Sequence, residues 1–357
     1  MTHYSFVESV DRLPHDLVES DVIGVDTEFM REKTYFAQLC LVQVATTEDI
    51  HFADPLKGVD LAAFWDATMD KTWVLHSARQ DIEVVYQTAD RMPSRIFDTQ
   101  VAAGLMGLAP QIGYANLARE LFEIDMAKSH TRADWTKRPL APGLLQYAAE
   151  DVEYLLPAFD VLSELLDRRG RLEWAEQDSA SLLEPALYSI DPANAITRLK
   201  GARNLRGRAR AAAERLAAWR ETEALKRDRP RQWIARDPIL MELATKRPRN
   251  RAELEKIDGI PPKLVQRAGR DLLAAVAASN GDSNNYKPPS APDESQKNLL
   301  KDMQTIVAAC ASDLELAPET IASKKELSAV IISGNRDSRL FTGWRRELIG
   351  DELLKLL

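Results

Sequence analysis

The sequence predicts an α/β domain followed by two all-helical blocks. Three apolar runs rich in strand-forming residues lie between residues 22 and 54, and a fourth, WVLH, occupies residues 73–76. From there to about residue 183 helical spacing of apolar residues predominates, and it continues through residues 204–284 and 297–357. Because 357 residues exceed what one hydrophobic core normally holds, two or three domains are expected.

The first domain, predicted at residues 1–190, begins with strands. They are expected at VIGVDTEF, QLCLVQVA and IHFAD, and WVLH follows them. Helical segments come next, and the segment ALYSIDPANA marks their end. Adjacent strands followed by strands and helices in alternation are typical of an α/β fold.

The remaining chain is predicted to be helical. Residues 204–284 are interrupted by turn signals at DRPRQ, ARDP, KRPRN and IDGIPP. A segment rich in Ser, Asn and Pro then predicts a linker at residues 285–296. Residues 297–357 form the last helical block, in which Trp344 with Arg345 and Arg346 either contacts a nucleic acid or packs in the core.

Composition excludes several classes of protein. With 45% hydrophobic and 29% charged residues the chain is typical of soluble proteins. No run of about 18 apolar residues occurs, and the N-terminus lacks the basic start and apolar core of a signal peptide. Two cysteines are too few for a disulfide framework or a zinc site. We therefore expect a cytoplasmic protein without a membrane partner.

The net charge of −8 conceals a strong segregation of charge. Residues 196–270 hold 21 Lys and Arg against 9 Asp and Glu, a net of +12, so the remainder carries −20. Six basic residues lie between Arg198 and Arg210, among them Arg203 and Arg206. Such a segment is either a solvated helix face or a binding surface for phosphates.

Two carboxylates lie inside the first apolar run. Asp26 and Glu28 are two residues apart, so on a strand they project from the same face. Buried neighbouring carboxylates repel unless a cation lies between them, and Mg²⁺ and Mn²⁺ prefer oxygen ligands. The alternative is an acid pair at a strand edge without chemistry.

Two further segments contribute polar groups. Asp81 follows a predicted helix start near Ala78, where an acid also serves simply to complement the helix dipole. Tyr147 and Asp151 are four residues apart in a helical pattern, so they leave one face together. Taken singly, they could equally be a core tyrosine and a solvated acid.

These five residues, in this order and with their flanking residues, resemble the DEDD superfamily of 3′–5′ exonucleases, in the branch with tyrosine in the third motif, and within it the ribonuclease D family. The similarity includes FMREKTYFAQLCLVQVA, IFDTQVAAGLMG and SHTRADWTKRPLAPGLLQYAAEDVEYL. It implies a ribonuclease H-like domain with a mixed five-stranded sheet. Residues 204–284 are similar to the HRDC domain, a helical nucleic-acid-binding module, and a second HRDC-like domain is implied at 297–357.

The resemblance also implies the roles of the five residues. Asp26, Glu28, Asp81 and Asp151 would hold two divalent ions, Mg²⁺ or Mn²⁺, and Tyr147 would orient the attacking water. A phenol with a pKa near 10 is a poor general base at neutral pH, which favours this orienting role.

Other residues are candidates for contacts with the nucleic acid. The backbone of Thr27 could approach the terminal ribose, and His76 either faces the nucleotide or is a structural group at a strand end. Arg138 precedes a proline and is either a phosphate ligand or part of an ordinary ion pair. Arg203 and Arg206 belong to the basic segment.

The resemblance predicts a metal-dependent exoribonuclease that shortens structured RNA from the 3′ end to nucleoside 5′-monophosphates, with tRNA precursors as substrates and a monomeric state. Two alternatives stay open: a DNA 3′–5′ exonuclease of repair type, because metal ligands do not recognise the sugar, and a non-catalytic RNA-binding protein.

Overall fold

The computed structural model describes residues 3–7, 13–126, 133–279, 286 and 292–357. The chain divides into two compact units. The first, here called the sheet unit, contains residues 1–30, 38–188 and 292–357. The second, the helical unit, contains residues 31–37 and 189–291.

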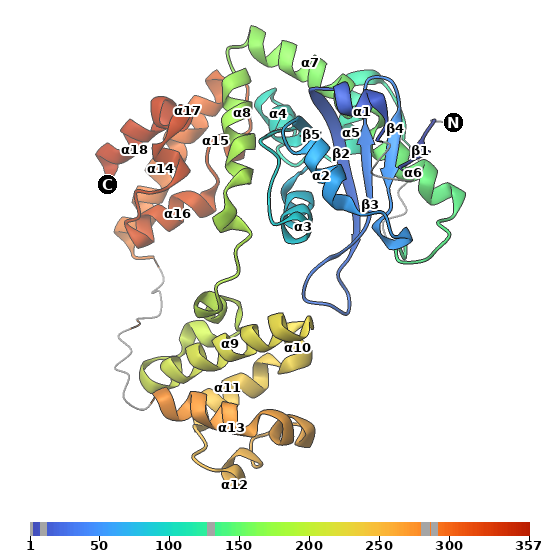
Figure 1. Ribbon diagram of the computed structural model, residues 1–357. Helices are drawn as coiled ribbons and strands as arrows, with labels where there is room; N and C mark the ends of the chain where they lie inside the picture. The colour runs from blue at the N-terminus through green and yellow to red at the C-terminus, as the bar shows by residue number, and fades with distance from the viewer. Residues whose placement is uncertain (1–2, 8–12, 127–132, 280–285, 287–291) are drawn as a thin grey trace. The chain divides into compact units, whose positions relative to one another are not determined.

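The sheet unit is built on a six-stranded mixed sheet (Figure 1). Its strands are β1 (Ser5–Phe6), β2 (Val22–Met30), β3 (Gln38–Ala45), β4 (Ile50–Ala53), β5 (Thr72–Leu75) and β6 (Arg95–Asp98), in the order β1-β4-β3-β2-β5-β6. β2, β3 and β4 pair antiparallel, whereas β1, β5 and β6 pair parallel with their neighbours. The four strands predicted from apolar runs are present, and the mixed α/β fold is confirmed. The short edge strand β1 brings the sheet to six strands instead of five.

Helices cover the sheet and lead away from it. They are α1 (His15–Glu19), α2 (Leu61–Thr68), α3 (Arg79–Ala89), α4 (Thr99–Leu105), α5 (Tyr114–Phe122), α6 (Pro142–Glu153), α7 (Leu155–Arg168) and α8 (Leu172–Ala180). α6 contacts β2 and β3, and α7 contacts β2 and β5. A Cβ atom on Gly24 of β2 would lie 3.1 Å from the Cβ of Leu155 at the start of α7, so glycine allows this close approach.

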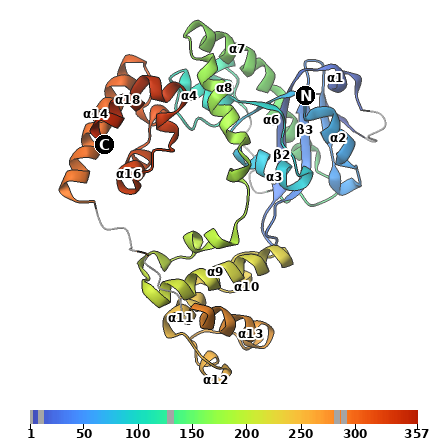
Figure 2. The ribbon, with the colours of Figure 1, turned by 60° about the vertical axis from the view of Figure 1, so that its left-hand side comes forward.

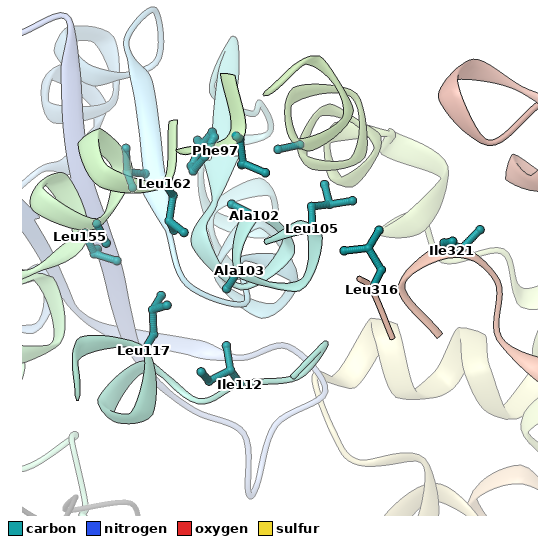
Figure 3. Packing of buried hydrophobic residues seen from close by; sticks show 14 of the residues in the cluster. Phe97, Ala102, Ala103, Leu105, Ile112, Leu117, Leu155, Leu162, Leu316 and Ile321 are labelled. Carbon is teal, nitrogen blue, oxygen red and sulfur yellow. The ribbon is translucent and has the colours of Figure 1, made fainter. Parts of the chain in front are cut away.

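The C-terminal helices belong to the same compact unit as the sheet. They are α14 (Glu294–Asp313), α15 (Pro318–Ile321), α16 (Lys324–Ser333), α17 (Gly343–Arg345) and α18 (Asp351–Leu356). Both views show them beside α4 and α8 (Figure 2). Leu316 and Ile321 share one hydrophobic cluster with Leu105 and Phe97 of the α/β part (Figure 3). The last block therefore shares a core with the α/β domain.

The helical unit has its own core. Its helices are α9 (Gly207–Arg227), α10 (Arg231–Ile234), α11 (Asp237–Lys246), α12 (Arg251–Leu254) and α13 (Pro262–Ala278). Leu216, Leu240, Leu254 and Leu272 are fully buried within it. Arg220 of α9 is also buried, and its guanidinium donates to Asp237 and to the carbonyl of Ala235. This ion pair ties α9 to the start of α11.

The two helical blocks repeat one pattern of helix lengths. α9, α10 and α11 have 21, 4 and 10 residues, and α14, α15 and α16 have 20, 4 and 10. The short second helix ends in both cases on an Ile-Ala pair, Ile234–Ala235 and Ile321–Ala322. This correspondence supports the prediction of a second HRDC-like module, although its sequence has diverged.

Half of the predicted linker at 285–296 lies outside the described residues, and α14 already begins at Glu294. Among the helices that the structure describes, none combines the length and the apolar character needed to cross a membrane.

Candidate active site

Three carboxylates meet where α6 packs against β2. Asp26 and Glu28 project from one face of β2, which is the face that Gly24 presents to α7. α6 contacts the same strand and carries Asp151. Asp26, Glu28 and Asp151 each offer an oxygen, and these oxygens all lie within 4.8 Å of one another. The fold thus brings together residues that are more than 120 positions apart in the sequence.

Tyr147 lies one helical turn before Asp151 on α6. Its hydroxyl is hydrogen-bonded to the Asp151 carboxylate, and its ring lies 6.3 Å from that of buried Trp135. Proline at the first position of α6 suits the start of a helix, and the helix ends at Glu153 shortly after the two side chains. The spacing of four therefore places the phenol and the carboxylate on one face, as predicted from the sequence.

Asp81 occupies a separate position beside β2. The parallel strand β5 pairs only with Val22–Gly24, so the rest of β2 is open on that side and α3 contacts it there. Asp81, in the first turn of α3, is buried and accepts a hydrogen bond of 2.6 Å from the Thr27 hydroxyl. Asp81 is outside the group of three carboxylates. The Thr27 side chain thus binds Asp81, and the approach of its backbone to a terminal ribose stays a prediction.

The start of α3 is fixed by Asp98, a residue that the sequence analysis did not single out. Its carboxylate accepts from the backbone amides of Ser77 (3.1 Å) and Ala78 (2.9 Å), and it also caps α4. The aspartate before Thr99 at a helix start is a recognisable capping signal. Its second role, holding the turn that presents Asp81, is visible only in the fold.

The carboxyl groups of the site have raised pKa values. Burial is the main cause for Asp26, and the neighbouring Asp81, Asp151 and Glu28 raise its pKa further. Burial raises the pKa of Glu28 to about 8, of Asp151 to about 7 and of Asp81 to about 6. Burial and the Asp151 charge also raise the pKa of Tyr147. An all-oxygen donor set with this unfavourable charge fits hard divalent cations such as Mg²⁺ and Mn²⁺.

His76 and Arg138 have partners within the protein. The His76 ring nitrogens lie 2.9 Å from the Thr99 hydroxyl and 2.9 Å from the Ile112 carbonyl, and burial lowers the pKa of the ring. Arg138 donates two hydrogen bonds of 2.7 Å to Asp54 and a third of 2.6 Å to the Cys40 carbonyl. His76 is thus a structural group at a strand end, and Arg138 is part of an ion pair. Contact of either residue with RNA stays a prediction.

The basic segment of the helical unit divides into paired and exposed residues. Arg198 pairs with Glu221, and Arg210 is buried against Glu214 with its guanidinium 3.9 Å from the Tyr286 ring centre. Arg203 and Arg206 are exposed, and no acid partner is found for either among the residues described. Contact of these two residues with phosphates stays a prediction.

Comparison with known proteins identifies the family. Residues 7–167 match the 3′-5′ exonuclease family model and residues 209–276 the HRDC domain model. A ribonuclease D from Gluconacetobacter diazotrophicus is 35% identical over 94% of this chain and 87% of its own length. One from Jannaschia sp. is 38% identical over 94% and 89%. The chain belongs to the ribonuclease D family. It is accordingly a 3′–5′ exoribonuclease.

Solved structures agree with this assignment. The crystal structure of Escherichia coli RNase D, described as an exoribonuclease involved in structured RNA processing, superposes with a TM-score of 0.90 at 26% identity. The alignment covers 100% of this chain and 99% of that one. The catalytic core of RRP6 from Trypanosoma brucei shares the fold at a TM-score of 0.59 and 23% identity, over 78% of this chain and 80% of that one. The ribonuclease D architecture thus extends over the whole chain.

The contact between Tyr147 and Asp151 leads to a prediction for this protein. Tyr147→Phe removes only the hydroxyl, which we expect to lower kcat by about 10²-fold because it eliminates one orienting hydrogen bond in the transition state. RNA affinity should stay within about twofold, because the ring and its packing remain. Single-turnover rates and equilibrium binding to the same RNA measure the two effects. An unchanged single-turnover rate would contradict the orienting role.

Proposed function

We propose that the protein hydrolyses structured RNA from its 3′ end, one nucleotide at a time, with two divalent cations and release of nucleoside 5′-monophosphates. Precursors of tRNA are the proposed substrates, and a monomer in the cytoplasm is the proposed state. The observation that carries the proposal is the cluster of three half-buried carboxylates, whose oxygens lie within 4.8 Å of one another, with raised pKa values and Tyr147 beside them.

The residues of the site have distinct roles in this proposal. Asp26, Glu28 and Asp151 would hold one cation, and Asp81 would contribute to the second. When bound, such a pair of ions lowers the pKa of water and stabilises the attacking and leaving oxygens of an in-line displacement. Tyr147 would form a hydrogen bond with the attacking water through its phenol oxygen and so fix the direction of the water, and its place on α6 beside Asp151 supports this role.

The helical unit would hold the body of the RNA. Its charge supports this role, since the basic excess lies there while the rest of the chain is acidic. A single-stranded 3′ tail would then reach the carboxylates, where its bases are unpaired and accessible.

Degradation assays test the proposed activity. A tRNA-like RNA with a short 3′ tail and its DNA counterpart are incubated with Mg²⁺ or Mn²⁺, with EDTA, and with no addition. We expect stepwise shortening of the RNA alone, 5′-monophosphates as products, and no shortening in EDTA. Shortening of DNA at a comparable rate would indicate a repair nuclease, and cleavage that persists in EDTA would refute the role of the cations.

A charge-reversal variant tests the basic segment. Arg203→Glu/Arg206→Glu should weaken binding to structured RNA about tenfold or more and reduce the slope of log K against log salt by about 1.8, since two phosphate contacts to a duplex are lost. Turnover on a short oligonucleotide should change little. Arg91→Glu/Arg168→Glu, with the same change of charge on exposed residues of the sheet unit, is the matched control. Equal losses in both variants would refute a local binding surface.

A further inference from the structure

Gln43 is a fully buried amide without a partner. It lies in the middle of β3, its side chain is inaccessible to solvent, and neither its amide nitrogen nor its amide oxygen makes a hydrogen bond. Among the residues described, it is the only one whose carboxamide is buried with both atoms unpaired. A buried polar group without a hydrogen bond costs about 1–3 kcal/mol, so an apolar residue would suit the strand better unless the amide has a function.

The strand register places Gln43 beside the acidic site. In the antiparallel pairing of β2 and β3, Asp26 lies directly opposite Gln43. Residues opposite each other point to the same face, with Cβ atoms about 4.5–5.5 Å apart. Glu28 shares this face two residues further along β2, and α6, which carries Asp151, contacts both strands. The unpaired amide therefore lies on the face of the sheet that holds the carboxylates.

We propose that Gln43 is a positioning residue for the cation site. Its amide would donate a hydrogen bond to Asp26 once Asp26 is ionised and a cation is bound. This inference rests on the proposed function, because it requires cations at the carboxylates. An ionised Asp26 has lone pairs that a cation does not use, and carboxylates that ligate metals normally accept hydrogen bonds from neighbouring groups. On the β3 side of Asp26, Gln43 is the residue directly opposite, and its amide can donate such a hydrogen bond.

The residue type suits this role. A glutamate at position 43 would add another negative charge to four carboxylates that already repel one another. A lysine or arginine would neutralise them and compete with the cation. The glutamine amide supplies two donors without changing the charge of the site.

Cation binding to the full chain provides the test. Gln43→Met keeps the length of the side chain and removes both donors. We expect its affinity for Mn²⁺, measured by calorimetry in the absence of RNA, to fall about 10- to 100-fold, the usual effect of losing a hydrogen bond to a metal ligand. Its thermal stability in EDTA should be equal to or above that of the parent, because an unpaired buried amide has been removed. Activity should be restored in part by raising the Mn²⁺ concentration.

Controls separate this inference from the proposed function. Gln87 on α3 also has an amide oxygen without a hydrogen bond, and its side chain is half-buried. Gln87→Met removes this amide and should leave the Mn²⁺ affinity unchanged. If Gln43→Met does not fold, Gln43→Asn, which keeps the amide but shortens its reach, should show the weakened binding. Parent and Gln43→Met with equal affinity would overturn the role of Gln43 alone. A parent protein that binds no Mn²⁺ would overturn both this role and the proposed cation site.

Discussion

Asp26→Asn is expected to lose about 10³-fold or more in turnover and, in EDTA, to be more stable than the parent protein. The loss of activity follows because a cation in the cluster supplies several kcal/mol of transition-state stabilisation, and each 1.36 kcal/mol corresponds to a tenfold change in rate. The gain in stability follows because Asp26 is buried among Asp81, Asp151 and Glu28, which raise its pKa. Asparagine has the same size and cannot ionise, so at a pH where the cluster is ionised, such as pH 8.5, the substitution removes that repulsion.

The pH dependence of stability has a defined sign. A carboxyl group whose pKa is raised by folding stabilises the folded state below its unfolded pKa, and this contribution is lost as the pH rises through the folded pKa. For Asp81, Asp151 and Glu28 the folded values are about 6, 7 and 8. The parent protein in EDTA should therefore lose stability between about pH 5 and pH 8, and Asp26→Asn should lose less.

Thermal unfolding in EDTA and in Mg²⁺, at pH 5.5 and 8.5, measures these effects. At pH 8.5 Mg²⁺ should raise the Tm of the parent by several degrees and that of Asp26→Asn by much less, because binding to the folded state stabilises it. Asp160→Asn, an exposed carboxyl on α7 of the same unit, is the control and should match the parent throughout. A Tm for Asp26→Asn below that of the parent in EDTA would contradict the electrostatic account.

Much of this site could be predicted from the sequence, because its residues occur in short motifs with local geometry. The strand period places Asp26 and Glu28 on one face, and the helix period does the same for Tyr147 and Asp151. The motifs alone do not give the distances between carboxylates that belong to different motifs. Oxygens of three carboxylates lie within 4.8 Å of one another, whereas Asp81 is outside this group and is hydrogen-bonded to Thr27, and only the packing of α3 beside β2 determines this.

Other features depend on contacts between distant residues, which no local pattern encodes. Gln43 interrupts the otherwise apolar residues 39–45 of β3, and its relevance appears only from its register with Asp26. The partners of Arg138, Asp54 and the Cys40 carbonyl, lie 84 and 98 residues away in the sequence. β1 has two residues, which is too short for a periodic signal, and β6, with the sequence RIFD, has only two apolar residues between two charged ones. The shared core of the C-terminal helices and the α/β part is equally invisible from helical spacing alone.

That shared core depends on a buried ion pair. The Arg345 side chain of α17 is 3% exposed and donates hydrogen bonds of 2.5 and 2.7 Å to the two carboxylate oxygens of Asp178, next to the C-terminal end of α8. It also donates to the carbonyls of Ile321 and Thr320. Trp344 stacks on Trp174 of α8, with ring centres 4.7 Å apart and an interplanar angle of 7°. Of the two alternatives for Trp344 and Arg345, packing in the core is therefore what the structure shows.

Arg345→Leu should destabilise the sheet unit by about 3–5 kcal/mol, because two carbonyls lose their donor and Asp178 loses its guanidinium partner. Among the residues described, Asp178 then keeps only the Trp344 indole N–H at 3.2 Å and Arg339 at 4.0 Å. We expect the thermal transition of this unit to fall by about 10 °C or more, at about 2–4 °C per kcal/mol for a unit of this size. Limited proteolysis should then cut near residue 292 and release the C-terminal helices. The core of the helical unit contains neither Arg345 nor Asp178, so this unit should unfold as in the parent.

Two comparisons isolate the buried charge as the cause. Arg346→Leu changes the neighbouring arginine, whose pair with Asp351 is exposed, and should shift the transition by no more than about 1 °C because exposed pairs contribute little. The double variant Arg345→Leu/Asp178→Leu removes both charges and should be more stable than Arg345→Leu alone, since no unpaired carboxylate remains. If the double variant is less stable than the single one, loss of packing around Trp344 accounts for the effect, and the attachment of the C-terminal helices depends on shape more than on charge.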